Sequence, residues 1–336
     1  MSKVPKLLLI VACLLSFLLL LGTFNGSKPR ILVLHSGQQD SPWVREVDRG
    51  MREALAANRR PVSVEWDYLD ISAPGADQRV QQAQAQRAVG RIDPAVLIAV
   101  DDEANLLVAR DYAGRAEPRI LYVSLDRPPA DYGYVGAPNV SGIAERLPFQ
   151  AVKEAITALN PGVTPSVSII GVDNVTGRAE MAQAQAFDWG PVTVDAAGLV
   201  SAAEGWREFV SGASNSDVLV VLSCRDLPEG DGAVFTAAEA SRWTQENSRA
   251  LPIGTQVDFV ENGGALSISP DPDDYGRTAI RLALDWLDDR TTPGPPPPVE
   301  SNHFAVSIRT DELNRRGVIL PPIYVEAARE NGTLLG

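Results

Sequence analysis

Polar side chains directly follow the predicted strands of this 336-residue chain. His35 and Ser36 come after the first strand, and Asp101 and Asp102 come after the third. In open parallel sheets a ligand binds beyond the carboxyl ends of the strands, so residues at these positions are candidate ligand contacts. The predicted site comprises His35, Ser36, Gln38, Trp43, Asp101, Asp102, Ser124, Asp126, Asn174, Asp226 and Asp258. Carboxylates outnumber cations in this set, which favours a ligand with an amine or hydroxyl groups over a polyanion.

Four of these residues also have a purely structural interpretation. Asp102 can cap the helix that follows it, because aspartate at such a junction accepts hydrogen bonds from free backbone amides. Asn174 fits a turn, and His35 fits a histidine whose hydrogen bonds are satisfied at a strand end. Trp43 fits a core aromatic residue, although a tryptophan beside a strand-end loop can also stack on a flat ligand.

The sequence lacks the familiar motifs of catalysis. It has no glycine-rich dinucleotide or phosphate loop, no nucleophile elbow and no His-Glu-x-x-His zinc motif. His35 and His303 are the only histidines, too few for a histidine-based metal site or triad. We therefore predict no catalytic residue, no metal site and no cofactor. Cys224 follows an apolar run, which is typical of a buried structural thiol rather than a nucleophile.

Short β-branched runs alternate with longer helical patterns from Pro29 onward, which is typical of βαβ units and a parallel sheet. The first series of predicted elements comprises strands at 31–35, 62–68, 95–100 and 119–124 and helices at 43–58, 77–90 and 102–113. After Asn139, the second series comprises helices at 147–160, 177–187, 202–212 and 233–246 and strands at 167–172, 192–195, 218–223 and 252–255. We therefore predict an α/β protein with two doubly wound parallel-sheet lobes.

A further segment, 263–287, is predicted to cross from one lobe to the other. It contains a buried strand, a turn rich in proline and aspartate up to Arg277, and an amphipathic helix from Thr278 to Leu287. The proline-rich segment 291–298 favours an extended, stiff connection. A hinge with three crossovers, near Asn139, Ser269 and Val299, would then join lobes made of 29–139 plus 270–298 and of 140–269 plus 299–336.

The first 28 residues have the pattern of an export signal. Lys3 and Lys6 precede a predominantly apolar run of 18 residues, from Leu7 to Phe24. The run is just long enough to span a bilayer as a helix, and no small-x-small cleavage site follows it. Residues 1–28 are therefore either a cleaved signal peptide or a retained membrane anchor, and both place the rest of the chain outside the cytoplasm.

The charge of the chain argues against one class of partner. Its 43 acidic and 30 basic side chains give a formal net charge of -13. Such a surface repels the phosphate backbone of nucleic acids. We therefore predict no nucleic acid partner.

Several segments resemble the ABC-type substrate-binding family with a type I periplasmic-binding fold that includes tryptophan- and tyrosine-associated transport receptors. The resemblance covers nearly all of 29–322 and rests on 31–36 with Trp43, 139–143, 159–161, 252–254, 263–277 and 316–321. Family members that bind amino acids tend to have a Gly-Thr pair where this chain has Asp101 and Asp102, so the resemblance does not imply an amino-acid carboxylate at that point. The opening His35-Ser36 with Trp43 is also similar to ligand-binding segments joined to sensor kinases.

The resemblance implies a periplasmic solute-binding protein that closes two lobes over a small molecule and presents it to an ABC permease in the inner membrane. Hinge closure needs no covalent chemistry, in agreement with the missing motifs. Two alternatives stay open. One is a ligand-sensing subunit of a membrane signalling partner, which a retained segment 7–24 would favour. The other is an extracytoplasmic enzyme that uses paired carboxylates such as Asp101 and Asp226 as acid and base.

Overall fold

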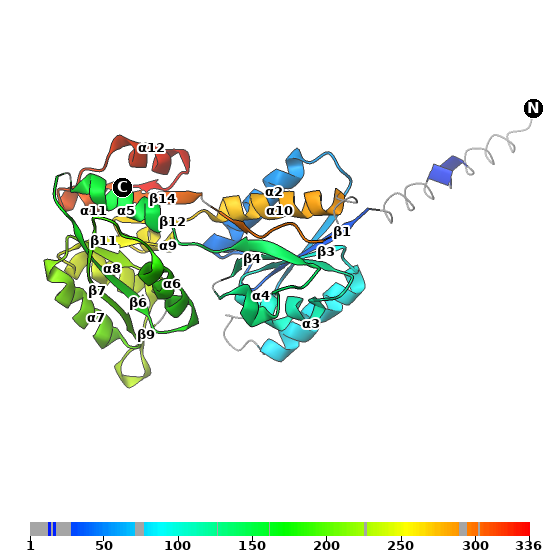
Figure 1. Ribbon diagram of the computed structural model, residues 1–336, viewed down its shortest axis with the longest axis horizontal. Coiled ribbons are helices and arrows are strands. Elements are labelled where there is room, and N and C mark those ends of the chain that lie inside the picture. The colour runs from blue at the N-terminus through cyan, green and yellow to red at the C-terminus, as the bar shows by residue number, and fades with distance from the viewer. Residues whose placement is uncertain are drawn as a thin grey trace, which may run out of the picture. The chain divides into compact units, whose positions relative to one another are not determined.

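The computed structural model describes residues 13–14, 16–17, 28–70, 77–125, 127–160, 162–224, 227–288, 294–301 and 303–336. These residues form two compact units (Figure 1). Unit 1 takes its described residues from Met1–Val123, Tyr132–Gly142 and Arg277–Pro297. Unit 2 takes its described residues from Ser124–Asp131, Ile143–Gly276 and Pro298–Gly336.

The sheet of unit 1 has the strand order β13-β5-β4-β3-β1-β2, in which β13 and the last residues of β4 and β5 come from segments assigned to unit 2. Its strands are β1 (Arg30–His35), β2 (Ser63–Tyr68), β3 (Val96–Val100), β4 (Arg119–Leu125), β5 (Val140–Ala144) and β13 (Val299–Glu300). β1 pairs in parallel with both β2 and β3, and β3 pairs in parallel with β4. The carboxyl ends of these four strands therefore meet at one edge of the sheet.

Helices cover this sheet because each has one apolar face. They are α2 (Pro42–Ala57), α3 (Gln78–Ile92), α4 (Asp102–Leu107) and α10 (Pro272–Asp288). In α2, Ser41 caps the first turn by accepting from the Val44 amide at 3.4 Å, and Pro42 stands where no amide donor is needed. The buried side chains of α2 include Val44, Val47 and Met51, which share one helical face.

The sheet of unit 2 has the strand order β15-β14-β12-β11-β8-β6-β7. Its strands are β6 (Ser166–Val172), β7 (Thr193–Val200), β8 (Val218–Val221), β11 (Leu251–Gly254), β12 (Leu266–Pro270), β14 (Phe304–Arg309) and β15 (Leu334–Leu335). β14 runs antiparallel to β12, and the other pairs are parallel. The helices of this unit are α5 (Phe149–Leu159), α6 (Val175–Ala186), α7 (Ala203–Gly212), α8 (Ala237–Asn247), α9 (Asp258–Glu261), α11 (Thr310–Arg315) and α12 (Pro322–Glu330).

Both faces of the unit 2 sheet are buried, as its strand composition requires. Val167 and Ile169 of β6 belong to one hydrophobic cluster with residues of α5, α6 and α12. Ile170 and Val172 belong to a second cluster with residues of α7, α8 and α9. Because side chains alternate between the faces of a strand, the apolar residues of β6 supply both clusters.

The turn predicted between β12 and its helix is shorter than expected. α10 begins at Pro272, so most of the Pro- and Asp-rich segment is helical. Asp271 accepts hydrogen bonds from the amides of Asp273 at 3.1 Å and Asp274 at 3.4 Å. Aspartate before a proline at the first helical position starts a helix, which is why this segment does not form an extended turn.

Other elements differ from the sequence prediction in extent. The helix predicted at 102–113 is divided into α4 and a 3₁₀ turn at Ala109–Tyr112. β7 runs to Val200 instead of ending at Asp195. The short β9 (Leu227–Pro228) and β10 (Val234–Phe235) pair before α8, where a helix was predicted from Ala233. β5, α9 and α12 were not predicted.

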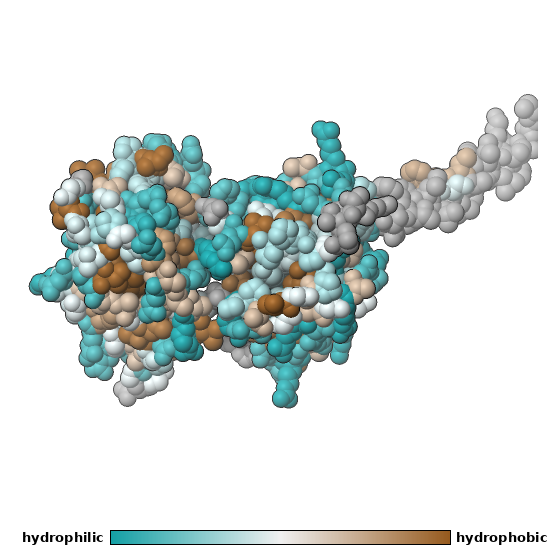
Figure 2. All heavy atoms as spheres, in the orientation of Figure 1, coloured by the Kyte–Doolittle hydropathy of each residue, from teal (hydrophilic) through white to brown (hydrophobic). Residues whose placement is uncertain are grey.

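Hydrophobic surface on the face shown in Figure 2 is broken into small patches among hydrophilic side chains. Among the residues that the structure describes, no helix is both long and apolar enough to cross a membrane. The predicted signal or anchor segment, 7–24, lies outside the described residues except for 13, 14, 16 and 17.

Candidate functional site

A buried hydrogen-bond network stands at the carboxyl ends of β1 and β2. His35 Nε2 lies 2.9 Å from Asp48 Oδ1, and the Tyr68 hydroxyl donates to Asp48 Oδ2 at 2.6 Å. The His35 and Tyr68 rings stack with their centroids 5.1 Å apart and their planes at 11°. Since an ionised carboxylate only accepts, Nε2 is the donor in this pair. Nδ1 is buried and has no hydrogen-bond partner among the described residues.

This network controls the ionisation of Asp48. Burial acts to raise the pKa of Asp48, but the hydrogen bonds from His35 and Tyr68 outweigh it and hold the pKa below its ordinary value of 3.8. Burial and the neighbouring Asp48 carboxylate raise the pKa of Tyr68, so its hydroxyl remains a donor at neutral pH. His35 itself is fully buried. The network therefore stabilises the end of β1 from within the protein core.

Replacing Asp48 by asparagine should lower the free energy of unfolding by about 2 kcal/mol at pH 7, because hydrogen bonds to a charged acceptor are lost. A carboxyl whose pKa is depressed by folding stabilises the fold above its unfolded pKa and loses this effect as the pH falls through its folded pKa. The difference between wild type and Asp48→Asn should therefore narrow below about pH 3.8. Urea unfolding at a series of pH values measures it, and a difference that is constant down to acid pH would contradict the assignment.

The ends of β1 and β3 are tied together by predicted site residues. The Ser36 hydroxyl donates to the Val100 carbonyl at 2.9 Å and accepts from the Ala104 amide at 2.8 Å. Asp101, at a φ of 71°, caps α4 and accepts from the Asp102 amide at 2.8 Å. The cap is thus Asp101, where the sequence suggested Asp102. Asp102 is buried, and its carboxylate accepts from the Tyr132 hydroxyl.

Asn105 is part of the same edge, and sequence reasoning missed it. Its Nδ2 donates to the carbonyls of Ala99 at 3.0 Å and Asp101 at 2.7 Å. Its Oδ1 accepts from the Tyr134 hydroxyl at 2.8 Å. Burial raises the pKa of Tyr134, which keeps this hydroxyl a donor. The available signal was the pair of tyrosines in the loop after β4, each of which needs a hydrogen-bond partner when buried.

Four further candidate residues come before β6 in the sequence: Gln38, Trp43, Ser124 and Asp126. Gln38 and Trp43 are partly exposed, in the loop after β1 and in the first turn of α2. Ser124, in β4, has a φ of 58°, is buried, and donates to the Glu145 carboxylate. Asp126 lies outside the described residues.

In unit 2, Glu180 of α6 joins the carboxyl ends of β8 and β11. Its Oε2 accepts from the Ser223 amide after β8 at 2.8 Å, and its Oε1 accepts from Gln256 Nε2 after β11 at 2.7 Å. Glu180 is almost fully buried. Sequence reasoning did not select it, although a single carboxylate among small residues on a buried helical face is a signal of such a role.

Asn174, Cys224 and Asp258 follow β6, β8 and β11, respectively. Asn174 caps α6 and accepts from the Gly177 amide at 2.7 Å. It is thus a helix cap, where the sequence suggested a turn residue. Asp258 is exposed at the start of α9. Burial raises the pKa of the Cys224 thiol to about 12, so the thiol is protonated at neutral pH and unsuited to nucleophilic attack. Asp226 lies outside the described residues.

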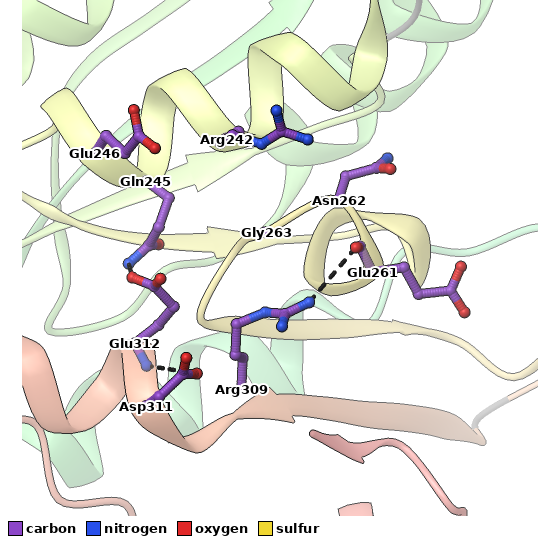
Figure 3. Close-up of a pocket in the computed structure, with 9 residues that line it drawn as sticks. All are labelled: Arg242, Gln245, Glu246, Glu261, Asn262, Gly263, Arg309, Asp311 and Glu312. Atoms are coloured by element: carbon purple, nitrogen blue, oxygen red, sulfur yellow. Dashed lines mark hydrogen bonds between the residues drawn. The ribbon is translucent and has the colours of Figure 1, made fainter. Parts of the chain in front are cut away.

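A separate cavity of about 300 Å³ lies in unit 2 among α8, α9 and α11 (Figure 3). Arg309, at the end of β14, donates from Nη2 to the Val260 carbonyl at 2.8 Å. Glu312 accepts from Gln245 at 3.2 Å and from Arg315 at 2.8 Å. The cavity is at the amino end of β12, because Leu266 pairs with Ile308 of the antiparallel β14. It is thus away from the carboxyl ends of the parallel strands, and no residue of the predicted ligand site lines it.

No family model matches the chain, and no curated protein matches its sequence. Solved structures do match its fold. A ligand-free, open substrate-binding protein with adhesive properties from Clostridium difficile is 15% identical, with a TM-score of 0.66, over 87% of this chain and 96% of that one. An ABC domain in complex with L-Trp from Streptococcus pneumoniae is 16% identical, with a TM-score of 0.60, over 90% and 98%. A periplasmic ribose ABC transporter protein from Conexibacter woesei is 13% identical, with a TM-score of 0.55, over 86% and 94%.

The chain has the type I periplasmic-binding fold. This result confirms the predicted fold class of two α/β lobes with parallel sheets, since the matches cover nearly the whole of each compared chain. The solved structures named above are described as transport or binding proteins. At 13% to 16% identity, the matches show the fold alone.

Proposed function

We propose that this protein is an extracytoplasmic solute-binding protein of an ABC-type uptake system, which binds a small molecule between its lobes by hinge closure. The observation that carries the proposal is the polar carboxyl edge of each sheet. In unit 1 this edge holds Ser36, Asp101 and Asp102, and in unit 2 it holds Asn174 and Asp258. In open α/β sheets this edge is where ligands bind.

The chemistry of these edges favours a ligand that donates hydrogen bonds. Carboxylates supply most of the charged groups, and Glu180 already uses both of its oxygens within unit 2. A sugar-like polyol or a molecule with an amine would offer donors to the other carboxylates. Contacts to both lobes would then stabilise the closed state, because a ligand shifts an equilibrium only by its difference in affinity for the two states.

The ligand itself can be identified from the purified protein. We expect native mass spectrometry to detect a small molecule that co-purifies, and small-angle X-ray scattering to show a smaller radius of gyration after it is added back. A ligand that binds without any change in the radius of gyration would argue against hinge closure. A ligand that is consumed during incubation would favour the enzyme alternative.

Two charge-neutralising variants test the predicted cleft. Asp101→Asn keeps a side chain that caps α4, and Asp226→Ala tests the second lobe. Each should weaken binding of the co-purifying molecule about tenfold to a hundredfold, since a charged hydrogen bond contributes about 1.5 to 3 kcal/mol. Glu208→Ala, on the exposed side of α7, is the control and should bind normally. Unchanged affinity in both cleft variants, by calorimetry, would place the site elsewhere.

We further propose that residues 7–24 export the chain and retain it as an inner-membrane anchor, next to a permease. The apolar length of this segment and the lack of a small-x-small site after it support retention. Retention would equally suit a subunit of a membrane sensor. Mass determination of the protein from the membrane fraction tests whether the segment is kept, and co-purification with a permease or with a sensor separates the two partners.

A further inference from the structure

A groove in unit 1 collects four arginines on the surface of an acidic protein. It has a volume of about 550 Å³ and lies between α2 and α10, which lie on the same side of the sheet in Figure 1. Its basic residues are Arg59, Arg60, Arg277 and Arg281. The carboxylates that line it are Glu53 and Asp285. Against a net charge of -13 for the whole chain, this groove is locally positive.

Half of these guanidinium groups are compensated within the fold. Arg277 forms an ion pair with Glu53 at 3.1 Å, and Arg60 forms one with Asp288 at 2.5 Å. Arg59 and Arg281 are exposed and have no ion-pair partner among the residues that the structure describes. Arg60 and Arg277 of the groove are therefore neutralised by ion pairs within the protein. Arg59 and Arg281 can bind an external anion. Guanidinium groups bind phosphate oxygens in a bidentate, planar arrangement.

The position of the groove indicates where that anion comes from. Arg60 stands three residues before Ser63, and Ser63 is the partner of Arg30 at the start of β1. The end of α10 reaches the same edge, because Arg119, the first residue of β4, donates to the carbonyl of Trp286. Phe24, the last residue of the apolar run, is six residues before Arg30, and six residues span at most about 20 Å.

We propose that the arginine groove binds the phosphate head groups of anionic lipids and so orients unit 1 on the membrane surface. The proposal rests on the membrane anchor proposed above, which would hold this edge within about 20 Å of the bilayer. The attraction of an anionic surface for arginine decays over about one Debye length, roughly 8 Å at physiological salt, so only a tethered and correctly turned unit would feel it. Without the groove, a strongly acidic protein would be repelled by the same surface.

Hydrogen exchange on the full chain tests this proposal. The protein is reconstituted into nanodiscs of phosphatidylcholine alone or with about a third phosphatidylglycerol. We expect amides within 53–60 and 277–285 to exchange about threefold to tenfold more slowly in the anionic discs, because bound head groups restrain the helix ends. The double variant Arg59→Gln/Arg281→Gln should abolish that difference. Arg79→Gln/Arg87→Gln, which removes two exposed charges from α3, is the matched control and should keep it.

Two results of the exchange experiment would contradict lipid binding by the groove. Equal exchange of the wild-type protein in the two kinds of disc would overturn the proposal. Protection by inorganic phosphate in neutral discs, equal to that by anionic lipid, would overturn the lipid as the source and leave a soluble phosphate compound. Incorporation into the discs tests the anchor separately, and the melting-temperature shift caused by the co-purifying solute tests the proposed cleft in the same variants.

Discussion

Replacing Gly142 by alanine should lower the free energy of unfolding by about 3 kcal/mol. Gly142 lies in β5, where an added Cβ would be closer than 3.0 Å to both the carbonyl oxygen and the ring of Tyr122. The Tyr122 carbonyl belongs to the backbone of β4, so it cannot move aside as a side chain would. The strands would have to separate, and the packing of the unit 1 sheet would be lost with them.

Gly90→Ala is the matched control for this variant. Gly90 lies within α3, and an added Cβ there would have no atom within 4 Å. Alanine at such a position should be neutral or should stabilise the protein by about 0.4 to 1 kcal/mol. Urea unfolding of both variants measures the contrast. If Gly142→Ala is as stable as Gly90→Ala, the close approach of β5 to Tyr122 is not a constraint on this fold.

The loss of Glu180 should have a comparable effect on unit 2. In Glu180→Ala the Ser223 amide and Gln256 Nε2 both lose a charged acceptor, so we expect the free energy of unfolding to fall by about 3 kcal/mol. Solute affinity should fall as well, because these bonds fix the loops after β8 and β11. Thermal and urea unfolding measure the first effect, and calorimetry with the co-purifying solute measures the second.

Two companion variants interpret the Glu180 result. Glu180→Gln keeps the length of the side chain and one acceptor oxygen, so it should lie between wild type and Glu180→Ala. Glu208→Ala removes an exposed carboxylate from α7 and should change stability by less than about 0.5 kcal/mol. If Glu180→Ala unfolds like Glu208→Ala, the buried carboxylate does not organise the strand ends.

The order of strands and helices could be predicted from sequence because apolar periodicity reports directly on burial. The strands β1, β3, β6 and β8 lie within two residues of their predicted bounds. Each consists mainly of apolar residues, as expected for a sheet covered on both faces. The segment 139–143 was selected for its resemblance to a family, and the structure supplies a physical reason. The Asn139 side chain accepts a hydrogen bond from the Gly114 amide and donates to the carbonyls of Tyr112 and Pro118. Gly142 allows β5 to lie close to β4.

That the polar residues at the strand ends contact a ligand stays a prediction. The structure shows which hydrogen-bond partners some of the residues at these ends have. Ser36 reaches a helix start 68 residues away in the chain, and Glu180 reaches strand ends 43 and 76 residues away. The periodicity of apolar residues indicates that a polar residue lies near a buried face. It does not indicate which donor or acceptor on another segment will form a hydrogen bond with that residue.

The same limit explains His35 and the arginine groove. From the sequence, His35 was an isolated histidine at a strand end, and only the fold brings it against Asp48 and Tyr68. Arg60 and Arg281 are separated by more than half of the chain, yet α2 and α10 place them in one groove. The sequence by itself determined the two α/β lobes, since burial is a local property of each element. The tertiary structure alone decided which charges and hydrogen bonds meet, because these depend on distances between segments that are remote in the chain.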